Sequence, residues 1–251
     1  MHILLTNDDG IYAEGIYAIY ETLRKLGKVT VVAPYSQQSS IGHAITLAHP
    51  IFYHECKRKG KFFGHGVTGT PADCVKFAID VVLKKKKPDI VVSGINFGPN
   101  EGCSVVYSGT CAGAREGALL GIPSMAVSLA AFIKPSFTHA AQYGAQIAKK
   151  LINFRLPKGT FLNLNVPHLK PSQIKGIRIT HQGLAPIHGS FYKRRDPKLR
   201  DYYWMTGDMP IPKVDDGSDT YALNKGYVTI APIQSDATNY HYVSELKKFF
   251  S

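Results

Sequence analysis

Short apolar runs alternate with helical patterns between residues 2 and 166, and this alternation limits the fold more than any other feature. The runs predict strands at 2–6, 29–33, 89–93, 124–129 and 161–166. The helical patterns predict helices at 14–26, 71–83, 110–120 and 136–153. Strands that are apolar on both sides belong in a parallel sheet with helices on both faces. The sequence therefore predicts an α/β fold.

The pattern changes beyond about residue 176, and we divide the chain there. Residues 1–175 form the predicted core, and residues 176–251 form a smaller part that serves oligomerisation. This second part contains two strand-like runs and a terminal helical pattern, at 177–180, 226–230 and 240–250. The stretch 185–220 is polar, aromatic and basic, with too little apolar content for a core of its own. We expect it to be an extended arm or hairpin that packs on another subunit.

Composition excludes several classes of protein. The 251 residues carry 30 basic and 18 acidic side chains, a net charge of +12, and 44% are apolar, which argues against disorder. No apolar run reaches the roughly 18 residues of a membrane span. The N-terminus lacks the basic region of a signal peptide, so we expect a cytoplasmic protein without a membrane partner. The cysteines lie far apart and are expected to be free thiols: Cys56, Cys74, Cys103 and Cys111.

Polar stretches follow directly after several predicted strands. Asn7-Asp8-Asp9-Gly10 follows the first strand, and Asn96 lies in the Gly- and Asn-rich stretch 93–100 after another. The carboxyl ends of parallel strands share the edge of the sheet where ligands bind. Two adjacent carboxylates repel each other unless a hard cation lies beside them, and amide oxygens also bind Mg²⁺ or Ca²⁺. The alternative for the two acids is a turn that caps a helix, and the sequence alone leaves both interpretations open.

Three further polar stretches have candidate roles at this edge. Residues 36–43 follow the second strand and supply hydroxyl oxygens. Residues 107–110 (Tyr-Ser-Gly-Thr) open a helix, whose first N–H groups either bind an anion or are satisfied by an ordinary Ser/Thr cap. Residues 69–74 (Gly-Thr-Pro-Ala-Asp-Cys) are best explained by capping, because Thr70 precedes Pro71 at the start of a helix.

Several familiar nucleotide and catalytic motifs are missing from the sequence. Neither a G-x-x-x-x-G-K-[ST] loop nor a G-x-G-x-x-G after the first strand occurs, which argues against P-loop and dinucleotide-binding proteins. The first strand is not followed by Asp-x-Asp, which disfavours a phosphatase of the haloacid dehalogenase type. The ten histidines show no zinc-binding spacing, and no G-x-S-x-G elbow is present.

The combination of motifs resembles the survival protein E family (SurE). The motifs that carry the resemblance, in the family's order and spacing, are residues 6–10, 69–74, 93–100 and 107–110. Later segments at 203–204 and 226–232 are also similar, so the resemblance covers nearly the whole chain. It implies a Rossmann-like three-layer α/β sandwich with a mainly parallel sheet. It also implies that the smaller C-terminal part exchanges elements between subunits.

The resemblance implies roles for individual residues. Asp8, Asp9, Ser39 and Asn96 match the family's metal-binding positions, with Ser40 as the substitute for Ser39 if the register shifts by one. Asp8 and Asn96 are also the implied catalytic residues, with Asp8 either a base toward the attacking water or only a metal ligand. The implied substrate contacts come from the phosphate loop and two nearby positions: Asn7, Gly42, Ser108, Gly109 and Thr110. The chain departs from the family at residues 35–38 (Tyr-Ser-Gln-Gln), where the family often has acidic and basic residues.

The implied function is that of a 5'-nucleotidase, a metal-dependent phosphomonoesterase acting on nucleoside 5'- and 3'-monophosphates, with polyphosphate shortening as a second activity. One divalent cation per subunit is implied, and oxygen donors favour Mg²⁺ or Mn²⁺ over Zn²⁺. We expect a homo-oligomer, a dimer or tetramer, and no specific nucleic-acid partner. Two alternatives stay open. One is a non-catalytic protein that binds RNA or polyphosphate through residues 155–205, and the other is a phosphatase for other small phosphomonoesters.

Overall fold

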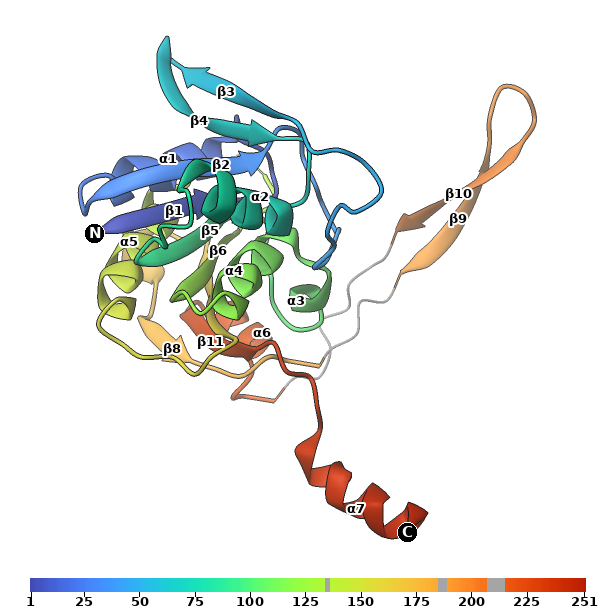
Figure 1. The fold of residues 1–251 in the computed structure, drawn as a ribbon. Coiled ribbons are helices and arrows are strands. Elements are labelled where there is room, and N and C mark those ends of the chain that lie inside the picture. Colours follow the sequence, from blue (N-terminus) through green and yellow to red (C-terminus); the bar gives the residue numbers. More distant parts are fainter. Residues whose placement is uncertain (134–135, 185–188, 207–214) are drawn as a thin grey trace.

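The structure, a computed structural model, describes residues 1–133, 136–184, 189–206 and 215–251 (Figure 1). The strands are β1 (His2–Thr6), β2 (Lys28–Pro34), β3 (Tyr53–Arg58), β4 (Lys61–Val67), β5 (Ile90–Phe97), β6 (Ser124–Ala130), β7 (Thr160–Pro167), β8 (Ile177–Ile179), β9 (Ser190–Arg195), β10 (Asp201–Thr206) and β11 (Val228–Gln234). The helices are α1 (Glu14–Leu23), α2 (Pro71–Phe77), α3 (Ser104–Tyr107), α4 (Gly109–Leu119), α5 (Thr138–Leu151), α6 (Asp219–Asn224) and α7 (Tyr240–Phe250). A π-helical turn at Ala78–Val82 continues α2, and a 3-10 turn lies at Pro171–Gln173.

Within the described ranges, the strands form a nine-stranded sheet in the order β3-β4-β2-β1-β5-β6-β7-β11-β8 and a separate hairpin of β9 and β10. From β4 to β7 all neighbouring strands are parallel. At the two ends, β3 is antiparallel to β4, and β11 is antiparallel to β7 while β8 runs parallel to β11. The predicted α/β fold with a mainly parallel sheet is therefore confirmed.

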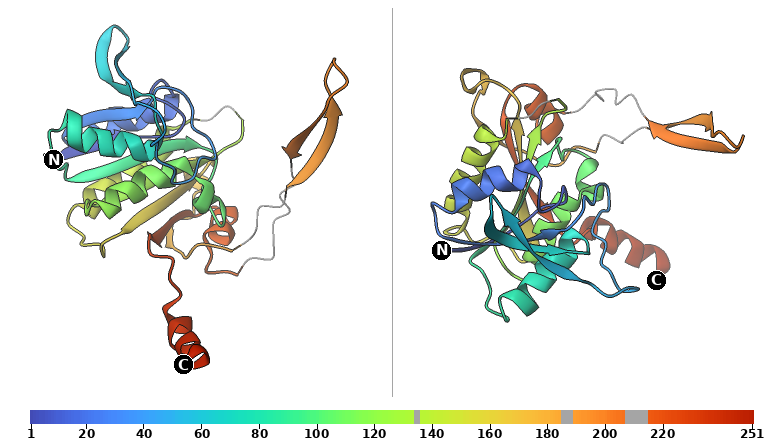
Figure 2. Two further views of the ribbon diagram at one scale, coloured as in Figure 1. Left: turned by 45° about the vertical axis from the view of Figure 1, so that its right-hand side comes forward. Right: turned by 90° about the horizontal axis from the view of Figure 1, so that it is seen from above.

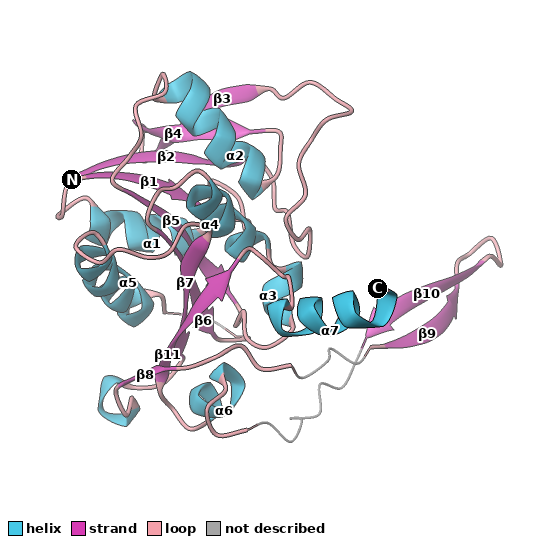
Figure 3. Ribbon diagram, turned by 60° about the horizontal axis from the view of Figure 1, so that its bottom comes forward, coloured by secondary structure: helices cyan, strands magenta, loops and turns pink. Residues whose placement is uncertain are grey.

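Helices cover both faces of the sheet, which forms the middle of three layers (Figure 3). α1 and α5 pack together on one face, and α2 and α4 pack together on the other. In β1, Ile3 and Leu5 belong to the core beneath α1 and α5, whereas Leu4 belongs to the core beneath α2. Because successive strand residues point to opposite faces, a strand covered on both faces needs apolar residues at every position. This requirement explains the continuous apolar runs of the sequence.

Glycines at every fourth position let α4 lie unusually close to the sheet. A Cβ atom at Gly113 would lie 2.8 Å from Ser93 Oγ, and one at Gly117 would lie 2.4 Å from Ser124 Oγ. Real Cβ atoms do not approach other atoms so closely, so larger residues would push the helix outward. The close approach fixes the first turn of α4 next to the end of β1.

The β3–β4 hairpin was not predicted from the sequence. Most residues of β3 are exposed, and only Cys56 among them is fully buried, so the strand lacks a continuous apolar run. Its place at the edge of the sheet explains this composition, since an edge strand has one neighbour and less burial.

The C-terminal part from residue 176 onward contributes both to the sheet and to two projecting elements. β8 and β11 complete the large sheet next to β7. The β9–β10 hairpin and α7 extend away from the sheet (Figures 1 and 2). Of the predicted arm at 185–220, residues 185–188 and 207–214 lie outside the described part, and α6 begins within its last residues. In the part of the chain that the structure describes, no helix combines the length and the apolar character needed to cross a membrane.

Candidate functional site

The candidate site lies where the order of strands reverses between β1 and β5. From β1 the chain passes through α1 to β2 on one side, whereas β5 is followed by α4 and β6 on the other. Open parallel sheets bind ligands at such a reversal, outside the carboxyl ends of the strands. Thr6 pairs with Ser93 near the ends of the two strands. The residues that follow them, including Asp8 and Asn96, therefore lie at the same edge.

Asp8 is a buried carboxylate, with 6% of its surface exposed. The Thr110 hydroxyl donates a hydrogen bond to its Oδ1 atom, and the Gln38 N–H donates to its backbone carbonyl at 2.8 Å. Burial raises the pKa of Asp8 to about 6; the Thr110 hydrogen bond opposes this rise and the nearby charge of Asp9 adds to it. A carboxylate in this environment is stabilised by a cation or by a proton.

Asp9 connects the ends of β1 and β5. The Phe97 N–H donates to Asp9 Oδ2 at 3.1 Å, and Gln37 Nε2 lies 3.5 Å from Oδ1. Burial raises the pKa of Asp9, and the hydrogen bond from Phe97 partly opposes the rise. Two neighbouring carboxylates thus both have an environment that disfavours their negative charge.

The loop after β2 brings Ser39 toward this pair of acids. Ser39 is exposed, and its Oγ atom accepts a hydrogen bond from Gln37 Nε2 at 2.9 Å. Since the same amide lies beside Asp9, Gln37 links the predicted metal ligands Asp9 and Ser39. Further along the loop, Gly42 has a positive φ of 61°, and its N–H donates to the Tyr107 carbonyl at 2.8 Å. That N–H therefore anchors the loop to the segment before α4.

The first turn of α4 lies against Asp8. Ser108 caps the helix, because its Oγ accepts from the Cys111 N–H at 3.0 Å. A Cβ atom at Gly109 would lie 2.8 Å from Asp8 Cβ and 3.1 Å from the Gln38 carbonyl oxygen, so only glycine permits this approach. The first N–H groups of a helix have no intrahelical acceptor and favour an anion. The predicted phosphate loop and the predicted metal ligands therefore adjoin.

Asn96 and Asn7 take different places in the site. Asn96 is half-buried at the end of β5, and its Nδ2 donates to the Gly98 carbonyl at 2.8 Å, which leaves Oδ1 as an acceptor. Asn7 is fully buried, and its Nδ2 donates to the Gly10 carbonyl at 2.9 Å across the turn after β1. Its Oδ1 has no hydrogen-bond partner among the described residues. Asn7 thus shapes the turn that presents the two acids.

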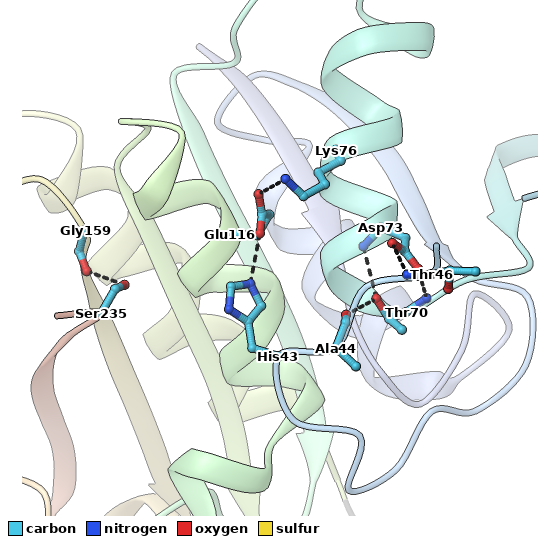
Figure 4. A network of polar contacts seen from close by, with 9 residues as sticks. All are labelled: His43, Ala44, Thr46, Thr70, Asp73, Lys76, Glu116, Gly159 and Ser235. Carbon is cyan, nitrogen blue, oxygen red and sulfur yellow. Dashed lines mark hydrogen bonds and ion pairs between the residues drawn. The ribbon is translucent and has the colours of Figure 1, made fainter. Parts of the chain in front are cut away.

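An ion network holds the middle of the loop after β2 to the helix layer (Figure 4). His43 Nε2 and Lys76 Nζ each lie 2.9 Å from a carboxylate oxygen of Glu116 in α4. The Glu116 side chain is 4% exposed. Burial alone would raise the pKa of Glu116, but the hydrogen bonds and charges of His43 and Lys76 outweigh it and hold the pKa below its ordinary value. The network ties the loop to α4 and α2.

The start of α2 fixes the next residues of the same loop. The Thr70 hydroxyl donates to the Ala44 carbonyl at 2.7 Å, and the Thr46 N–H donates to Asp73 Oδ1 at 3.0 Å. Thr70 and Asp73 also form a capping box at the start of α2, so the capping role predicted for residues 69–74 is confirmed. Thr70 and Asp73 therefore cap α2 and also hold the loop after β2 in place.

The donor set of the site fits a hard divalent cation. Its two carboxylates have raised pKa values, and the neighbouring hydroxyl and amide groups supply further oxygens. Oxygen donors suit Mg²⁺, Mn²⁺ or Ca²⁺, whereas zinc sites use mostly cysteine and histidine. Among the described residues, no group of three or more His, Cys, Asp or Glu side chains is arranged to hold a metal.

Some residues of the site were not singled out from the sequence. Gln37 joins Ser39 to Asp9, the Phe97 N–H binds Asp9, and Glu116 anchors the loop through His43. All three act through contacts between distant segments, which the local pattern of a single sequence does not reveal. For Glu116, the available signal was an acidic residue in a helix otherwise rich in Ala and Gly.

The fold and this edge define a doubly wound α/β protein whose ligand site combines two carboxylates with a helix N-terminus. The model of the family "Survival protein SurE" matches residues 3–188 of the chain. The chain is therefore a member of the SurE family, as its motifs indicated.

Relatives and a solved structure agree with this assignment. The chain is 44% identical to the 5'-nucleotidase SurE of Syntrophus aciditrophicus over 252 aligned residues, which cover 100% of this chain and 94% of that protein. It is 43% identical to the 5'-nucleotidase SurE of Syntrophobacter fumaroxidans, with 99% of each protein covered. The crystal structure of the SurE protein from Aquifex aeolicus matches with a TM-score of 0.87 and 39% identity, covering 100% of both chains.

Proposed function

We propose that the protein is a divalent-metal-dependent nucleotidase that hydrolyses nucleoside monophosphates to a nucleoside and phosphate. Relatives at 43% and 44% identity are named 5'-nucleotidase SurE, which supports hydrolysis of nucleotide phosphomonoesters. The observation that carries the proposal is the contact between Asp8 and the first turn of α4. This contact would make a cation held by the acids and a phosphate held by the helix direct neighbours.

The side chains have distinct roles in this proposal. Asp8, Asp9, Ser39 and Asn96 would hold one Mg²⁺ or Mn²⁺ per subunit. When bound, the ion would offset the negative charge of the phosphate and lower the pKa of water. Thr110 orients Asp8 through its hydroxyl group. The N–H groups at the start of α4 donate to phosphate oxygens, and this arrangement suits phosphoryl transfer, which depends mainly on positioning and charge stabilisation.

Phosphate release from AMP and GMP tests the proposal. We expect release with Mg²⁺ or Mn²⁺ and loss of release with EDTA, and calorimetric titration with Mn²⁺ should give one site per subunit. Release that EDTA leaves unchanged would contradict metal dependence. A protein that releases phosphate from other small phosphomonoesters but from no nucleotide would instead be a phosphatase of a different specificity. The same series with polyphosphate tests the second activity.

The alternative of a non-catalytic RNA or polyphosphate binder finds less support in the β9–β10 hairpin. Lys193 and Arg195 form ion pairs with Asp201 at 2.6 Å and 2.9 Å, and Arg200 pairs with Asp196 at 2.7 Å. Three of the hairpin's five basic side chains are thus engaged by carboxylates, which offset two of its five positive charges. Salt-sensitive RNA binding without phosphate release would nevertheless favour this alternative.

We also propose that the protein is a homo-oligomer in which the projecting elements pack on another subunit. The hairpin exposes large apolar side chains, among them Phe191, Tyr192, Trp204 and Met205. α7 exposes a similar set, which includes Leu246, Phe249 and Phe250. Such dense apolar exposure on elements that project from the sheet is typical of an interaction surface.

A further inference from the structure

A hollow of about 270 Å³ opens beside Asp9, on the side of the site that faces α1. Its described lining comes from the start of α1, the loop after β2, the end of β5 and the residue before α5. The lining residues are Asp9, Ala13, Glu14, Gly15, Gln37, Phe97 and Phe137. The hollow thus shares Asp9 with the metal site but lies apart from the first turn of α4.

The charges around the hollow disfavour an anion. Asp9 and Glu14 contribute carboxylates, and no basic side chain is among its described lining residues. Arg58 of β3 pairs with Glu14 and also donates to the Tyr12 carbonyl at 3.0 Å, so the guanidinium is already engaged. A phosphate would therefore stay between the metal ligands and α4. The part of a substrate that extends toward α1 should carry no negative charge.

The rings of the hollow suit a flat, uncharged group. Phe97 is 42% exposed although it directly follows the half-buried Asn96. Its backbone N–H is bound to Asp9 Oδ2 at 3.1 Å, which fixes the ring's point of attachment relative to the metal ligands. Phe137 is half-buried, and a Cβ atom at Gly15 would lie 3.3 Å from its Cε1 atom, so the ring packs on the start of α1. The Phe97 ring is thus exposed, whereas the Phe137 ring is held by its packing on α1.

We propose that this hollow binds the nucleoside part of the substrate, with the base stacked on Phe97 and the phosphate held beyond Asp9. The inference rests on the proposed nucleotidase function and extends it to substrate selection. Stacking on an aromatic ring tolerates every base, so purine and pyrimidine nucleotides are both substrates. Besides Asp9, the polar side chains of the lining are the Gln37 amide and the Glu14 carboxylate, which would face a base edge or ribose hydroxyls. The acidic lining disfavours an extended polyanion on this side.

Comparing AMP with ribose 5-phosphate isolates the contribution of the base. We expect the Phe97→Ala variant to raise KM for AMP roughly tenfold, in line with base–aromatic stacking elsewhere, with kcat nearly unchanged. Hydrolysis of ribose 5-phosphate should be the same in both proteins, because it lacks the base. Phe97→Trp should restore the KM for AMP. Phe62→Ala, which removes a ring of similar exposure from β4, serves as the matched control and should have no effect.

Adenosine provides a second measurement that does not depend on turnover. We expect adenosine to bind the unmodified protein, observed by ligand-detected NMR, and to bind Phe97→Ala roughly tenfold more weakly. If AMP and ribose 5-phosphate have equal kcat/KM, or if Phe97→Ala leaves KM for AMP and adenosine binding unchanged, the inference is overturned while the nucleotidase function stands. If neither phosphate ester is hydrolysed, the nucleotidase function fails, and adenosine binding still decides whether the hollow is a nucleoside site.

Discussion

At the scale of single residues, the site depends on carboxylates placed where their charge is poorly solvated. Asp8 is almost completely buried and Asp9 is adjacent, and burial raises the pKa of both. Without a functional reason such a pair would be unfavourable, because each charge loses solvation and repels the other. Thr110 and the Phe97 N–H orient the two carboxylates but do not neutralise them. The proposed cation would account for both the burial and the adjacency.

Asp8→Asn should therefore remove activity and leave the fold intact. The amide keeps the shape of the side chain and loses the charge that the proposed cation needs. A metal ion contributes several kcal/mol to such a reaction, so we expect phosphate release from AMP to fall at least about a hundredfold. The Mn²⁺ affinity measured by calorimetry should fall as well, while the circular dichroism spectrum stays unchanged. Retained activity at saturating Mn²⁺ would be incompatible with the assigned site.

Glu101 is a further carboxylate whose burial lowers the stability of the folded protein, although it has no role in the proposed site. Burial, together with the charge of Asp219, raises the pKa of Glu101 from 4.5 to about 7. Its Oε2 atom has no hydrogen-bond partner among the described residues. Between these two pH values the unfolded chain ionises Glu101 whereas the folded protein keeps it protonated. The contribution of Glu101 to the free energy of unfolding is therefore highest below its unfolded pKa. It decreases as the pH rises through about 7, because the unfolded chain ionises this group more readily than the folded protein does.

Glu101→Gln should remove this pH dependence. We expect the variant to be more stable than the unmodified protein at about pH 8, by at most about 3 kcal/mol, with the difference disappearing near about pH 4. Urea unfolding at the two pH values measures the change. A constant difference at both pH values would show that Glu101 does not titrate between them.

At the scale of structural elements, the loop after β2 is positioned by the helices that it crosses. Glu116 of α4 binds both His43 of the loop and Lys76 of α2. Since the loop carries Ser39 toward Asp9, the network helps to position a ligand of the proposed metal site without touching it. The folded pKa of Glu116 lies below its ordinary value, so its contribution to stability is present above the unfolded pKa and is lost as the pH falls through the folded value.

Glu116→Gln should weaken both the fold and the site. We expect a loss of about 2 kcal/mol in unfolding free energy near about pH 7, typical of hydrogen bonds to charged groups, and a smaller loss near about pH 3. Mn²⁺ affinity should also decrease, because the loop that bears Ser39 is less firmly held. Glu21→Gln is the matched control, since Glu21 pairs with Arg24 on the exposed face of α1. An equal effect of both variants would argue against a role of the loop.

The sequence predicted elements better than it predicted their contacts. The predicted strands at 2–6, 29–33 and 161–166 correspond to β1, β2 and β7, because strands covered on both faces must be apolar throughout. The convergence of Asp8, Asn96 and the start of α4 also followed from parallel strands sharing one edge. In contrast, the mostly exposed strand β3 had no such pattern, and the β3–β4 hairpin was missed with it. The contacts of Gln37 and Glu116 depend on the path of a long loop, which no local periodicity encodes.

At the scale of the whole molecule, the projecting elements distinguish this chain from a self-contained α/β domain. β8 and β11 are part of the large sheet, yet the segments before and after them leave it. The hairpin stands away from the sheet in both views of Figure 2, and α7 does so in the left-hand view. α7 is amphipathic, and its apolar side chains Val243, Leu246 and Phe250 recur at the spacing of one helix face. An isolated helix of this length is marginally stable in water, so α7 requires a surface to pack on.

A second copy of the chain is the surface that we expect α7 to find, and charge substitutions on the helix test this. Leu246→Asp combined with Phe250→Asp should convert the oligomer to a smaller species, measured by light scattering over a range of concentrations. Each buried apolar side chain contributes about 1.5–3 kcal/mol, so the dissociation constant should rise more than tenfold per substitution. Ser244→Asp adds one such charge to α7 without removing an apolar group and should leave the mass unchanged, and it is compared with the Leu246→Asp single variant. A monomeric mass for the unmodified protein at every concentration would refute the oligomer.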